Sequence, residues 1–385
     1  MSHPLHILLV EDSPSDAELI QIFIEKSPVR TKLHRVETIA AALVAIDEAS
    51  KAGDAFDAAL LDLALPDSTG LQTYRRLAGH RPELPVIILS GLAGDEIAVA
   101  AVKEGAQDYL PKSEMSSSNL ARAIRYSVER HERILEQHRL AQLEHDMQTA
   151  STIQKRLLPR VPANVPGLDI AALSVPADAT GGDFYDFFRL PNGQLGAMIA
   201  DVSGHGLGAS FIMASTMGTI RSLIHDHSDP GKILTAANQQ VFEDTSAEHF
   251  VTAFCGILDP NRQEMLFANA GHGGWLLHES GAIESLDSPG GFPLGISAEH
   301  AYQASPVIRL TPGTSLILLT DGLHEAVSQD GALFTMDRVH ATLRDLRGAS
   351  AAELVDGTLA TVSQFCQPGK PLDDMTMVAL TMRPA

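Results

Sequence analysis

The stretch from Ser116 to Leu158 contains no glycine or proline and is dense in residues that favour helix. It predicts one long helix that ends at Pro159, because proline cannot continue a helix. A chain of 385 residues is also too long for a single ordinary core. We therefore expect three parts, namely a domain over 1–115, a helical linker over 116–160 and a second domain over 161–385.

The predicted helix carries a weak heptad pattern. Its apolar or small positions are Ile124, Val128, Leu135, Leu143, Met147, Ala150 and Leu157. His131 and Arg139 interrupt this seam. The seam fits either a parallel, dimeric coiled coil or a stripe that packs on the chain's own domains. We favour a homodimer through the linker helix, because the segment is rich in charge and lies between two separate domains.

The composition excludes several classes of partner. A formal net charge of −20 and a pI near 5.1 repel nucleic acid and anionic membrane surfaces, so we expect protein partners. Cys255 and Cys366 are the only cysteines, which cannot form a disulfide framework and indicate a reducing compartment. No segment approaches the ~20 apolar residues that span a bilayer. These features predict a cytoplasmic protein.

Short apolar runs alternate with amphipathic stretches from His6 to Lys112. This alternation predicts an α/β domain, a doubly wound, flavodoxin-like parallel sheet covered by helices. Ligands bind at the carboxyl ends of the strands in such sheets. The polar residues expected at those ends are Glu11, Asp12, Asp62, Ser90 and Lys112. Acidic groups beside Asp62 are able to hold Mg²⁺, while a hydroxyl and a lysine suit a phosphoryl group.

Four segments of this domain resemble the response-regulator receiver family. They are the Glu11-Asp12 pair, Asp62 to Pro66 followed by Gly70, Ser90-Gly91, and Tyr109 to Lys112. The resemblance covers the whole first domain. It implies that Asp62 accepts a phosphoryl group from a sensor histidine kinase or phosphotransfer protein. Glu11, Asp12 and Asp62 would hold Mg²⁺, Ser90 and Lys112 would sense the new charge, and Tyr109 would reorient.

Four aspartates of the second half each adjoin an apolar run or a glycine turn. They are Asp183, Asp201, Asp321 and Asp373. Carboxylates at the ends of buried strands repel one another unless cations neutralise them, and sets of oxygen ligands suit Mg²⁺ or Mn²⁺. Metal-assisted phosphoryl chemistry is therefore expected. Strands and helices here occur in blocks, which predicts a layered α+β domain with apposed sheets, a β-sandwich.

Seven segments in this order resemble the SpoIIE-like branch of the PPM, or type 2C, protein phosphatases. They are TIQKRLLP, GGDFYD, DVSGHGLGA, ANAGH, GFPLGI, LTDGLHEA and DDMT, between Thr152 and the C-terminus. The resemblance implies two Mg²⁺ or Mn²⁺ ions that activate water for attack on a phosphoserine or phosphothreonine. Asp201 would contact both ions, and the Val202 carbonyl would complete the shell of the first. Asp321 and Asp373 would hold the second ion, and Asp183 would act through water. Asp374 is a further candidate ligand, and Asp186 is a nearby acid to which the resemblance assigns no role.

Two histidines are candidate proton donors, and one position departs from the phosphatase pattern. His205 and His272 could each donate a proton to the leaving oxygen, but a histidine near a glycine turn is more often structural, and we assign neither to catalysis. Many type 2C enzymes have an arginine shortly before the first aspartate. This chain has Asp178-Ala179-Thr180 there, so the metals would be the main phosphate ligands.

Together these features predict a two-component response regulator whose phosphorylation on Asp62 controls a metal-dependent serine/threonine phosphatase. The resemblance implies a phosphorylated anti-sigma-factor antagonist as substrate. One alternative is a non-catalytic adaptor that binds a sigma-factor pathway protein through a phosphatase-like domain. A DNA-binding regulator is disfavoured by the acidic charge and by the lack of a helix-turn-helix pattern after the linker.

Overall fold

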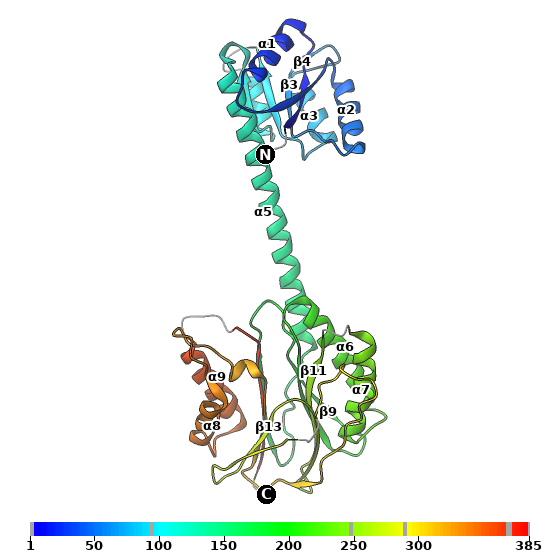
Figure 1. The fold of residues 1–385 in the computed structure, drawn as a ribbon, viewed down its shortest axis with the longest axis vertical. Helices are drawn as coiled ribbons and strands as arrows, with labels where there is room; N and C mark the ends of the chain where they lie inside the picture. Colours follow the sequence, from blue (N-terminus) through cyan, green and yellow to red (C-terminus); the bar gives the residue numbers. More distant parts are fainter. Residues whose placement is uncertain (1–3, 92–95, 246–248, 288–290, 367–371, 384–385) are drawn as a thin grey trace. The chain divides into compact units, whose positions relative to one another are not determined.

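The computed structural model describes the chain except residues 1–3, 92–95, 246–248, 288–290, 367–371 and 384–385 (Figure 1). The chain divides into two compact units, residues 1–143 and 144–385, which are described separately. Within the described residues, no helix combines the length and the apolar character needed to span a bilayer.

The first unit is a parallel sheet with the strand order β2-β1-β3-β6-β7. Its strands are β1 (Leu5–Val10), β2 (Thr31–Val36), β3 (Ala58–Asp62), β6 (Val86–Ser90) and β7 (Asp108–Pro111). Its helices are α1 (Pro14–Glu25), α2 (Ile39–Lys51), α3 (Leu71–His80), α4 (Glu96–Lys103) and the first part of α5 (Ser117–Leu157). A short hairpin, β4 (Ala64–Leu65) and β5 (Ser68–Thr69), follows β3. This topology confirms the predicted doubly wound α/β fold.

Apolar runs produce this sheet because its central strands are buried on both faces. Alternate residues of β1 enter different cores: Leu8 packs into the core that includes α2 and α3, and Ile7 into the core that includes α1 and the start of α5. Helix α1 begins where Ser13 caps it, since the Ser13 hydroxyl accepts a hydrogen bond from the Asp16 amide and Pro14 occupies the first turn.

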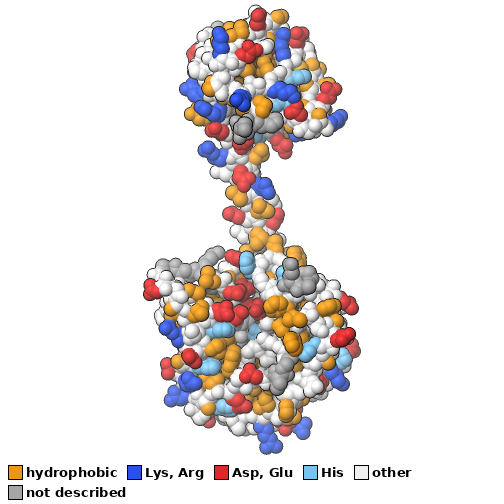
Figure 2. All heavy atoms as spheres, viewed as in Figure 1, with side chains coloured by type: hydrophobic (Ala, Val, Ile, Leu, Met, Phe, Trp, Pro, Cys, Tyr) orange, Lys and Arg blue, Asp and Glu red, His pale blue; other side chains and the backbone are white. Residues whose placement is uncertain are grey.

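Helix α5 confirms the prediction of one long helix between the two domains. The seam residues Ile124 and Val128 are buried in the core of the first unit, and Leu157 packs against a core of the second. Leu135 and Leu143 are 44% and 51% exposed. Figure 2 shows hydrophobic side chains among charged ones along the middle of the helix. The middle of the seam is therefore available for another partner.

The second unit contains two five-stranded antiparallel sheets, ordered β15-β12-β11-β10-β9 and β14-β13-β16-β17-β8. The strands of the first sheet are β9 (Phe184–Arg189), β10 (Leu195–Val202), β11 (Val251–Asp259), β12 (Glu264–Ala270) and β15 (Ile308–Arg309). Those of the second are β8 (Leu168–Val175), β13 (Gly274–Leu277), β14 (Ile283–Ser285), β16 (Ser315–Leu319) and β17 (Met375–Met382). The sheets face each other across a core in which the Phe254 and Phe267 rings stack 5.1 Å apart.

Helices cover the outer faces of both sheets. Helices α6 (Leu207–Leu223) and α7 (Pro230–Asp244) pack on the first sheet, while α8 (Thr335–Asp345) and α9 (Ala351–Phe365) cover the second (Figure 1). Each covering pair buries its apolar stripe in a separate core. This helix-sheet-sheet-helix arrangement confirms the predicted layered α+β sandwich.

The register of the strands brings the aspartates to one end of each sheet. Ala200 of β10 pairs with Phe184 of β9, so the end of β10, with Asp201, lies beside the start of β9, which follows Asp183. Leu319 of β16 pairs with Met377 of β17, which places the segments carrying Asp321 and Asp373 together in the same way. Each sheet therefore supplies two of the four aspartates.

Candidate functional site

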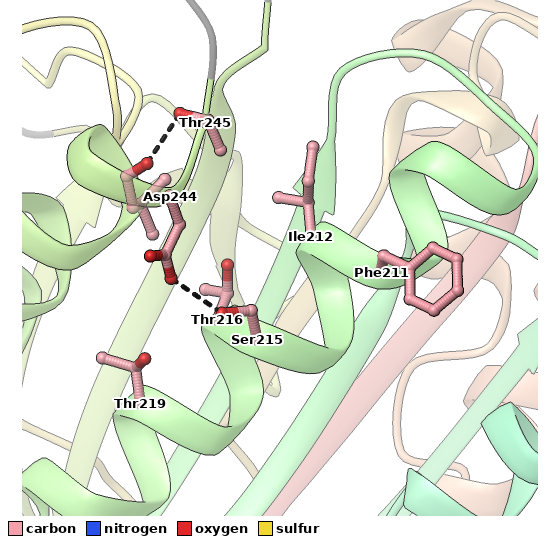
Figure 3. Close-up of a pocket in the computed structure, with 8 residues that line it drawn as sticks. Phe211, Ile212, Ser215, Thr216, Thr219, Asp244 and Thr245 are labelled. Atoms are coloured by element: carbon pink, nitrogen blue, oxygen red, sulfur yellow. Dashed lines mark hydrogen bonds between the residues drawn. The ribbon is translucent and has the colours of Figure 1, made fainter.

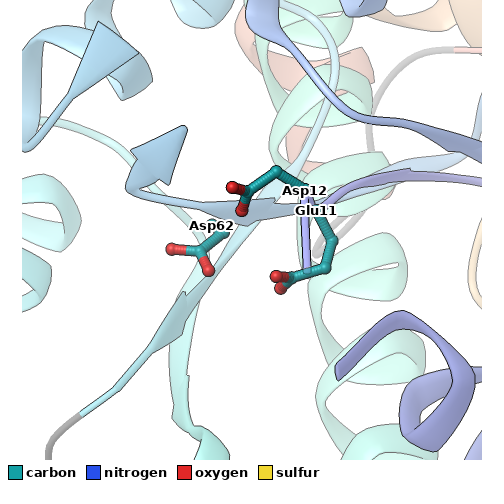
Figure 4. A group of neighbouring side chains, drawn as sticks. All are labelled: Glu11, Asp12 and Asp62. Carbon is teal, nitrogen blue, oxygen red and sulfur yellow. The ribbon is translucent and has the colours of Figure 1, made fainter. Parts of the chain in front are cut away.

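The first unit brings three acidic side chains together at the carboxyl ends of β1 and β3. One ligand oxygen each of Glu11, Asp12 and Asp62 lies within 4.8 Å of the others (Figure 4). Lys112, which follows β7, places its Nζ 2.6 Å from Asp62 and 2.7 Å from Glu11. The residues predicted from the sequence at these strand ends are therefore close enough to share a ligand.

Electrostatics make this acidic pocket dependent on cations. Burial and the neighbouring Asp62 charge raise the pKa of Glu11, although its contact with Lys112 opposes the shift. Burial alone would lower the pKa of Lys112, but hydrogen bonds to Asp16, Asp62 and Glu11 raise it well above its ordinary value. The Asp16 carboxylate, 2.7 Å from Lys112, is a partner that the sequence analysis missed. Its position four residues after Asp12 in the first turn of α1 was the available signal.

Ser90 and Tyr109 occupy the neighbouring strands. Ser90 ends β6 and is buried, and its strand lies between those of Asp62 and Lys112 because Asp62 pairs with Leu89 and Ser90 pairs with Pro111. Tyr109 on β7 is half-buried against the core of this unit. The structure therefore places Glu11, Asp12, Asp62, Ser90 and Lys112 at the carboxyl ends of neighbouring strands, and Tyr109 lies two residues before the end of β7.

In the second unit, Asp183 is buried and Asp201 is half-buried at the end of the first sheet. Burial, and next the charge of Asp201, raises the pKa of Asp183 well above its ordinary range. Burial and the charges of Asp321 and Asp373 raise the pKa of Asp201 to about 7. The charges of two aspartates of the second sheet therefore act on Asp201 of the first sheet.

Asp321 and Asp373 complete this group from the second sheet. Asp321 opens a short 3₁₀ turn after β16 and is half-buried, whereas Asp373 is exposed just before β17. Burial raises the pKa of both carboxyls, and the charge of Asp321 contributes to the shift of Asp373. Among the described residues, the phosphatase aspartates do not form a trio within the 4.8 Å spacing that the receiver acids meet.

A network of hydrogen bonds fixes the Gly181 to Asp183 loop. Asp374 accepts the Gly182 amide at 2.7 Å and, through its other oxygen, the Ala177 amide at 2.8 Å. The Gln154 side chain of α5 binds both backbone groups of Gly181. A Cβ at Gly181 would collide with the Asp374 carboxylate, so this position requires glycine.

Asp374 and Asp186 are therefore occupied by other contacts. Both Asp374 oxygens accept backbone hydrogen bonds, which favours a role in holding the loop over that of a metal ligand. Asp186, on β9, is buried and ion-paired with Arg221 of α6 at 2.6 Å. Arg221 also donates to the Leu157 carbonyl at the end of α5.

Thr320 and Val202 support the aspartates from adjacent positions. The Thr320 hydroxyl donates to Asp183 at 2.6 Å and accepts the Thr376 amide at 3.0 Å. The Val202 carbonyl oxygen lies next to Gly182, where an added Cβ would come within 2.8 Å of it. Sequence reasoning missed Thr320, although it directly precedes Asp321, and missed Gln154 within the TIQKRLLP segment.

The two histidines differ in their surroundings. His272 is buried, its Nδ1 lies 2.9 Å from the Thr252 hydroxyl, and burial lowers its pKa to about 4. This environment favours the structural interpretation of His272. His205 is exposed, and its Nδ1 is 4.0 Å from Asp178. Its positive charge would lower the pKa of Asp373, which places it near the mouth of the aspartate group.

The donor set fits hard divalent cations. Its side-chain donors are carboxylates, and the backbone supplies a carbonyl, with no thiol in the set. Carboxyls that raise each other's pKa in a buried position repel one another when ionised, and a cation bound among them would remove that repulsion. The residues present therefore suit Mg²⁺ or Mn²⁺.

Comparison with known families decides between the possible classes. Residues 191–383, half of the chain, match the family Stage II sporulation protein E (SpoIIE). The chain belongs to the SpoIIE family. Residues 7–125 of this SpoIIE-family protein match the response regulator receiver domain. Both resemblances inferred from the sequence motifs are confirmed.

Curated relatives are each similar to a portion of the chain. The SpoIIE-family chain is 27% identical over 241 residues to phosphoserine phosphatase RsbU of Bacillus subtilis, covering 62% of this chain and 70% of RsbU. It is 27% identical over 146 residues to phosphoserine phosphatase RsbP of the same organism, covering 37% of this chain and 36% of RsbP. Its receiver is 34% identical over 106 residues to the photosynthetic apparatus regulatory protein RegA of Rhodobacter capsulatus, covering 28% of this chain and 54% of RegA.

Solved structures agree with the fold of the second unit. The SiaA-PP2C domain of Pseudomonas aeruginosa superposes with a TM-score of 0.56 at 22% identity, over 64% of this chain and 98% of that domain. The RsbU and RsbW domains of Rv1364c from Mycobacterium tuberculosis give a TM-score of 0.52 at 24% identity, over 59% of this chain and 63% of that structure. Together with the family match, these findings make the SpoIIE-family chain a metal-dependent protein serine/threonine phosphatase joined to a receiver domain.

Proposed function

We propose that this protein is a response regulator in which phosphorylation of Asp62 controls dephosphorylation of a serine-phosphorylated anti-sigma-factor antagonist. Three parts would carry out this function: a receiver over 1–115, a linker over 116–160 and a phosphatase over 161–385. Similarity to RsbU and RsbP supports the phosphoserine substrate. The receiver match supports a sensor histidine kinase or phosphotransfer protein as the source of the phosphoryl group.

The convergence of the four aspartates supports this proposal most strongly. They come from four segments that lie far apart in the sequence, yet the charges of Asp321 and Asp373 act on Asp201, and Asp201 acts on Asp183. Carboxylates gathered at one end of two sheets, one of them buried and two half-buried, repel one another without a counter-charge. Their convergence is therefore best explained by binding of cations.

We assign Asp183, Asp201, Asp321 and Asp373, with the Val202 carbonyl, to the ligands of two Mg²⁺ or Mn²⁺ ions. When bound, such ions supply Lewis acidity that activates water and offsets phosphate charge. Thr320 and Asp374 would hold the Asp183 side chain and loop in place. His205, exposed at the mouth, is free to give a proton to the leaving serine oxygen if it is protonated.

In the receiver, Glu11, Asp12 and Asp62 would hold one Mg²⁺, and Asp62 would take the phosphoryl group. Lys112 contacts Asp62 in the described state and would pair with the added phosphate. Ser90 would contact the phosphoryl oxygen, and Tyr109 would reorient as the switch. Phosphorylation controls the phosphatase only if it favours one of two arrangements of the linker. A homodimer through α5 would be one such arrangement.

Phosphate release tests the proposal. The substrate is a serine-phosphorylated antagonist protein, and Mn²⁺ is present in the assay. The rate of the full chain is compared with the rate of the Asp201→Ala variant and with the rate of the full chain after addition of a chelator. We expect loss of at least a hundredfold in rate in both cases. Equal rates in all three would support the adaptor alternative. Asp259→Ala, on the far end of β11, is the matched control for loss of an aspartate.

Regulation is tested separately on the same substrate. The receiver is phosphorylated with a small phosphodonor, and the rate is compared with that of Asp62→Ala under the same conditions. The proposal expects the phosphodonor to change the rate of the normal chain and not that of the variant. A response that survives in Asp62→Ala would remove Asp62 from the mechanism while leaving the phosphatase assignment intact.

A further inference from the structure

Large apolar side chains lie exposed beside the segments that carry the phosphatase aspartates. Leu207, Phe211 and Phe250 form one group, here called the α6 rim, and Leu333 and Leu372 form another, the β17 rim. Phe211 and Leu372 are 72% and 78% exposed. On the face drawn in Figure 2, acidic side chains of this unit gather in one area with hydrophobic side chains close by. Exposed apolar groups of this size in contiguous segments are typical of binding surfaces.

The α6 rim is built on the loop that begins at Asp201. Phe250 and Ser203 are joined by two hydrogen bonds, from the Ser203 amide to the Phe250 carbonyl at 2.9 Å and from the Phe250 amide to the Ser203 hydroxyl at 3.0 Å. Helix α6 starts at Leu207, and Phe211 lies one turn further on the same face. The opposite face of α6 is buried in the core, so the rim is not needed to hold the helix.

The β17 rim adjoins the aspartates of the other sheet. Leu372 directly precedes Asp373 in the sequence. Together with Leu333 and Glu325 it lines a recess of about 270 Å³ that also includes Gly322 and Asp373. A Cβ on Gly322 would collide with the Asp374 carbonyl, so the Asp321 turn and the Asp373 segment are packed tightly together. The rim is therefore fixed relative to its two aspartates.

A groove lies behind the α6 rim. It has a volume of about 390 Å³ and is lined by Phe211 and Ile212 of α6 and by Val241 and Asp244 of α7, among others (Figure 3). The Ser215 hydroxyl donates to the Asp244 carboxylate across it at 2.9 Å. This groove could receive an apolar side chain that projects from a partner beside Phe211.

We propose that the α6 rim and the β17 rim bind the apolar surface of a folded protein substrate around its phosphoserine. This inference rests on the proposed phosphatase function. A phosphoserine side chain is short, so a folded protein that brings it to the aspartates must cover the residues next to them during each turnover. The rims expose large apolar side chains beside the acidic residues of the site, and such side chains suit contact with an apolar protein surface. Contact on both rims would favour folded protein substrates over small phosphate esters by raising kcat/KM for the folded protein.

Substrates of decreasing size test this inference. The full chain with Mn²⁺ is assayed on a folded serine-phosphorylated antagonist, on the tryptic phosphopeptide from that protein and on para-nitrophenyl phosphate. The variants are Phe211→Ser and Leu372→Ser, one on each rim. Val307→Ser is the control, because Val307 is also an exposed apolar residue, at 56% exposure. It adjoins β15, which pairs with the first residues of β12, Glu264 and Met265. This end of the sheet is remote from Asp201.

We expect each rim variant to lower kcat/KM for the folded protein by about tenfold or more, as loss of an interface anchor does. The rates on phosphopeptide and para-nitrophenyl phosphate should change less than about twofold, and Val307→Ser should match the unmodified chain. An equal loss on all three substrates, or none on the folded protein, would overturn the inference. A rim variant that instead halves the solution mass would show that a second copy covers the rim, which also overturns it. Absence of phosphate release from all three substrates in the unmodified chain would be a failure of the proposed function itself.

Discussion

Asp374 accepts a hydrogen bond from the backbone amide of Gly182 at 2.7 Å, while its neighbour Asp373 is exposed and accepts the Asp374 amide at 2.8 Å. Two adjacent acids therefore have different tasks. Asp374 holds the loop that carries Asp183, and we propose Asp373 as a cation ligand.

This difference predicts opposite effects of two conservative changes. Asp374→Asn replaces one acceptor oxygen by a donor and leaves a backbone amide without its partner, which should lower the free energy of unfolding by about 2 kcal/mol. Asp373→Asn should weaken activation by Mn²⁺ about tenfold or more with little loss of stability. Urea unfolding and Mn²⁺ titration of activity measure the two effects. The assignment is wrong if Asp374→Asn weakens metal activation with unchanged stability.

Thr320 provides a second test of the support around Asp183. Thr320→Val keeps the shape of the side chain but removes the hydroxyl that donates to Asp183 and accepts the Thr376 amide. Because both partners are buried, we expect a loss of about 2 to 3 kcal/mol in the free energy of unfolding. Thr320→Ser retains the hydroxyl and should recover most of it. If Thr320→Val unfolds at the same urea concentration as the unmodified chain, the two hydrogen bonds of the hydroxyl do not stabilise the fold.

His272 predicts a defined dependence of stability on pH. Its pKa is near 4 when folded and 6.5 ordinarily, so between these values the unfolded chain binds a proton that the folded chain does not. Stability from this group is complete above pH 6.5 and is lost as the pH falls. Between pH 7.5 and pH 5 the loss should be about 2 kcal/mol.

The comparison of His272→Gln with the unmodified chain isolates this contribution. Unfolding by urea is followed at pH 7.5 and pH 5. A chelator is present because the aspartates also titrate, and metal bound to them would add its own dependence of stability on pH. The variant should lose about 2 kcal/mol less than the unmodified chain over this interval. The same slope in both proteins would show that His272 is protonated or solvated in the folded state.

The sequence predicts the strands and the polar residues at their ends better than it predicts the contacts between distant segments. Apolar runs that end in Asp62, Ser90 or Asp201 revealed both the strands and the polar groups at their ends, because strand ends are marked locally. The hydrogen bond from Gly182 to Asp374 joins residues 192 positions apart, and the contact of Thr320 with Asp183 joins residues 137 apart. No local pattern specifies such pairs. The linker seam illustrates the same limit, since Ile124 and Leu143 fit one heptad but have different surroundings.

The exposed middle of α5 predicts a dimer. Leu143 is 51% exposed, and Met147 lies one turn further along the same helix. If the seam pairs with a second chain, the solution mass should approach twice 41.1 kDa. Replacing Leu143 and Met147 by glutamate should reduce it to that of one chain, whereas Gln148→Glu, at an exposed position of the same helix, should not. Light scattering over a range of concentrations measures the mass, and a single chain at every concentration would exclude the dimer.

Mn²⁺ titration by calorimetry tests the central claim most directly. The chain carries Asp62→Ala to remove the receiver site, and it is compared with the same protein after Asp201→Ala. We expect two ions to bind the first protein and that binding to be lost, or weakened at least a hundredfold, in the second. Identical uptake by the two proteins, or no uptake by either, would contradict the account.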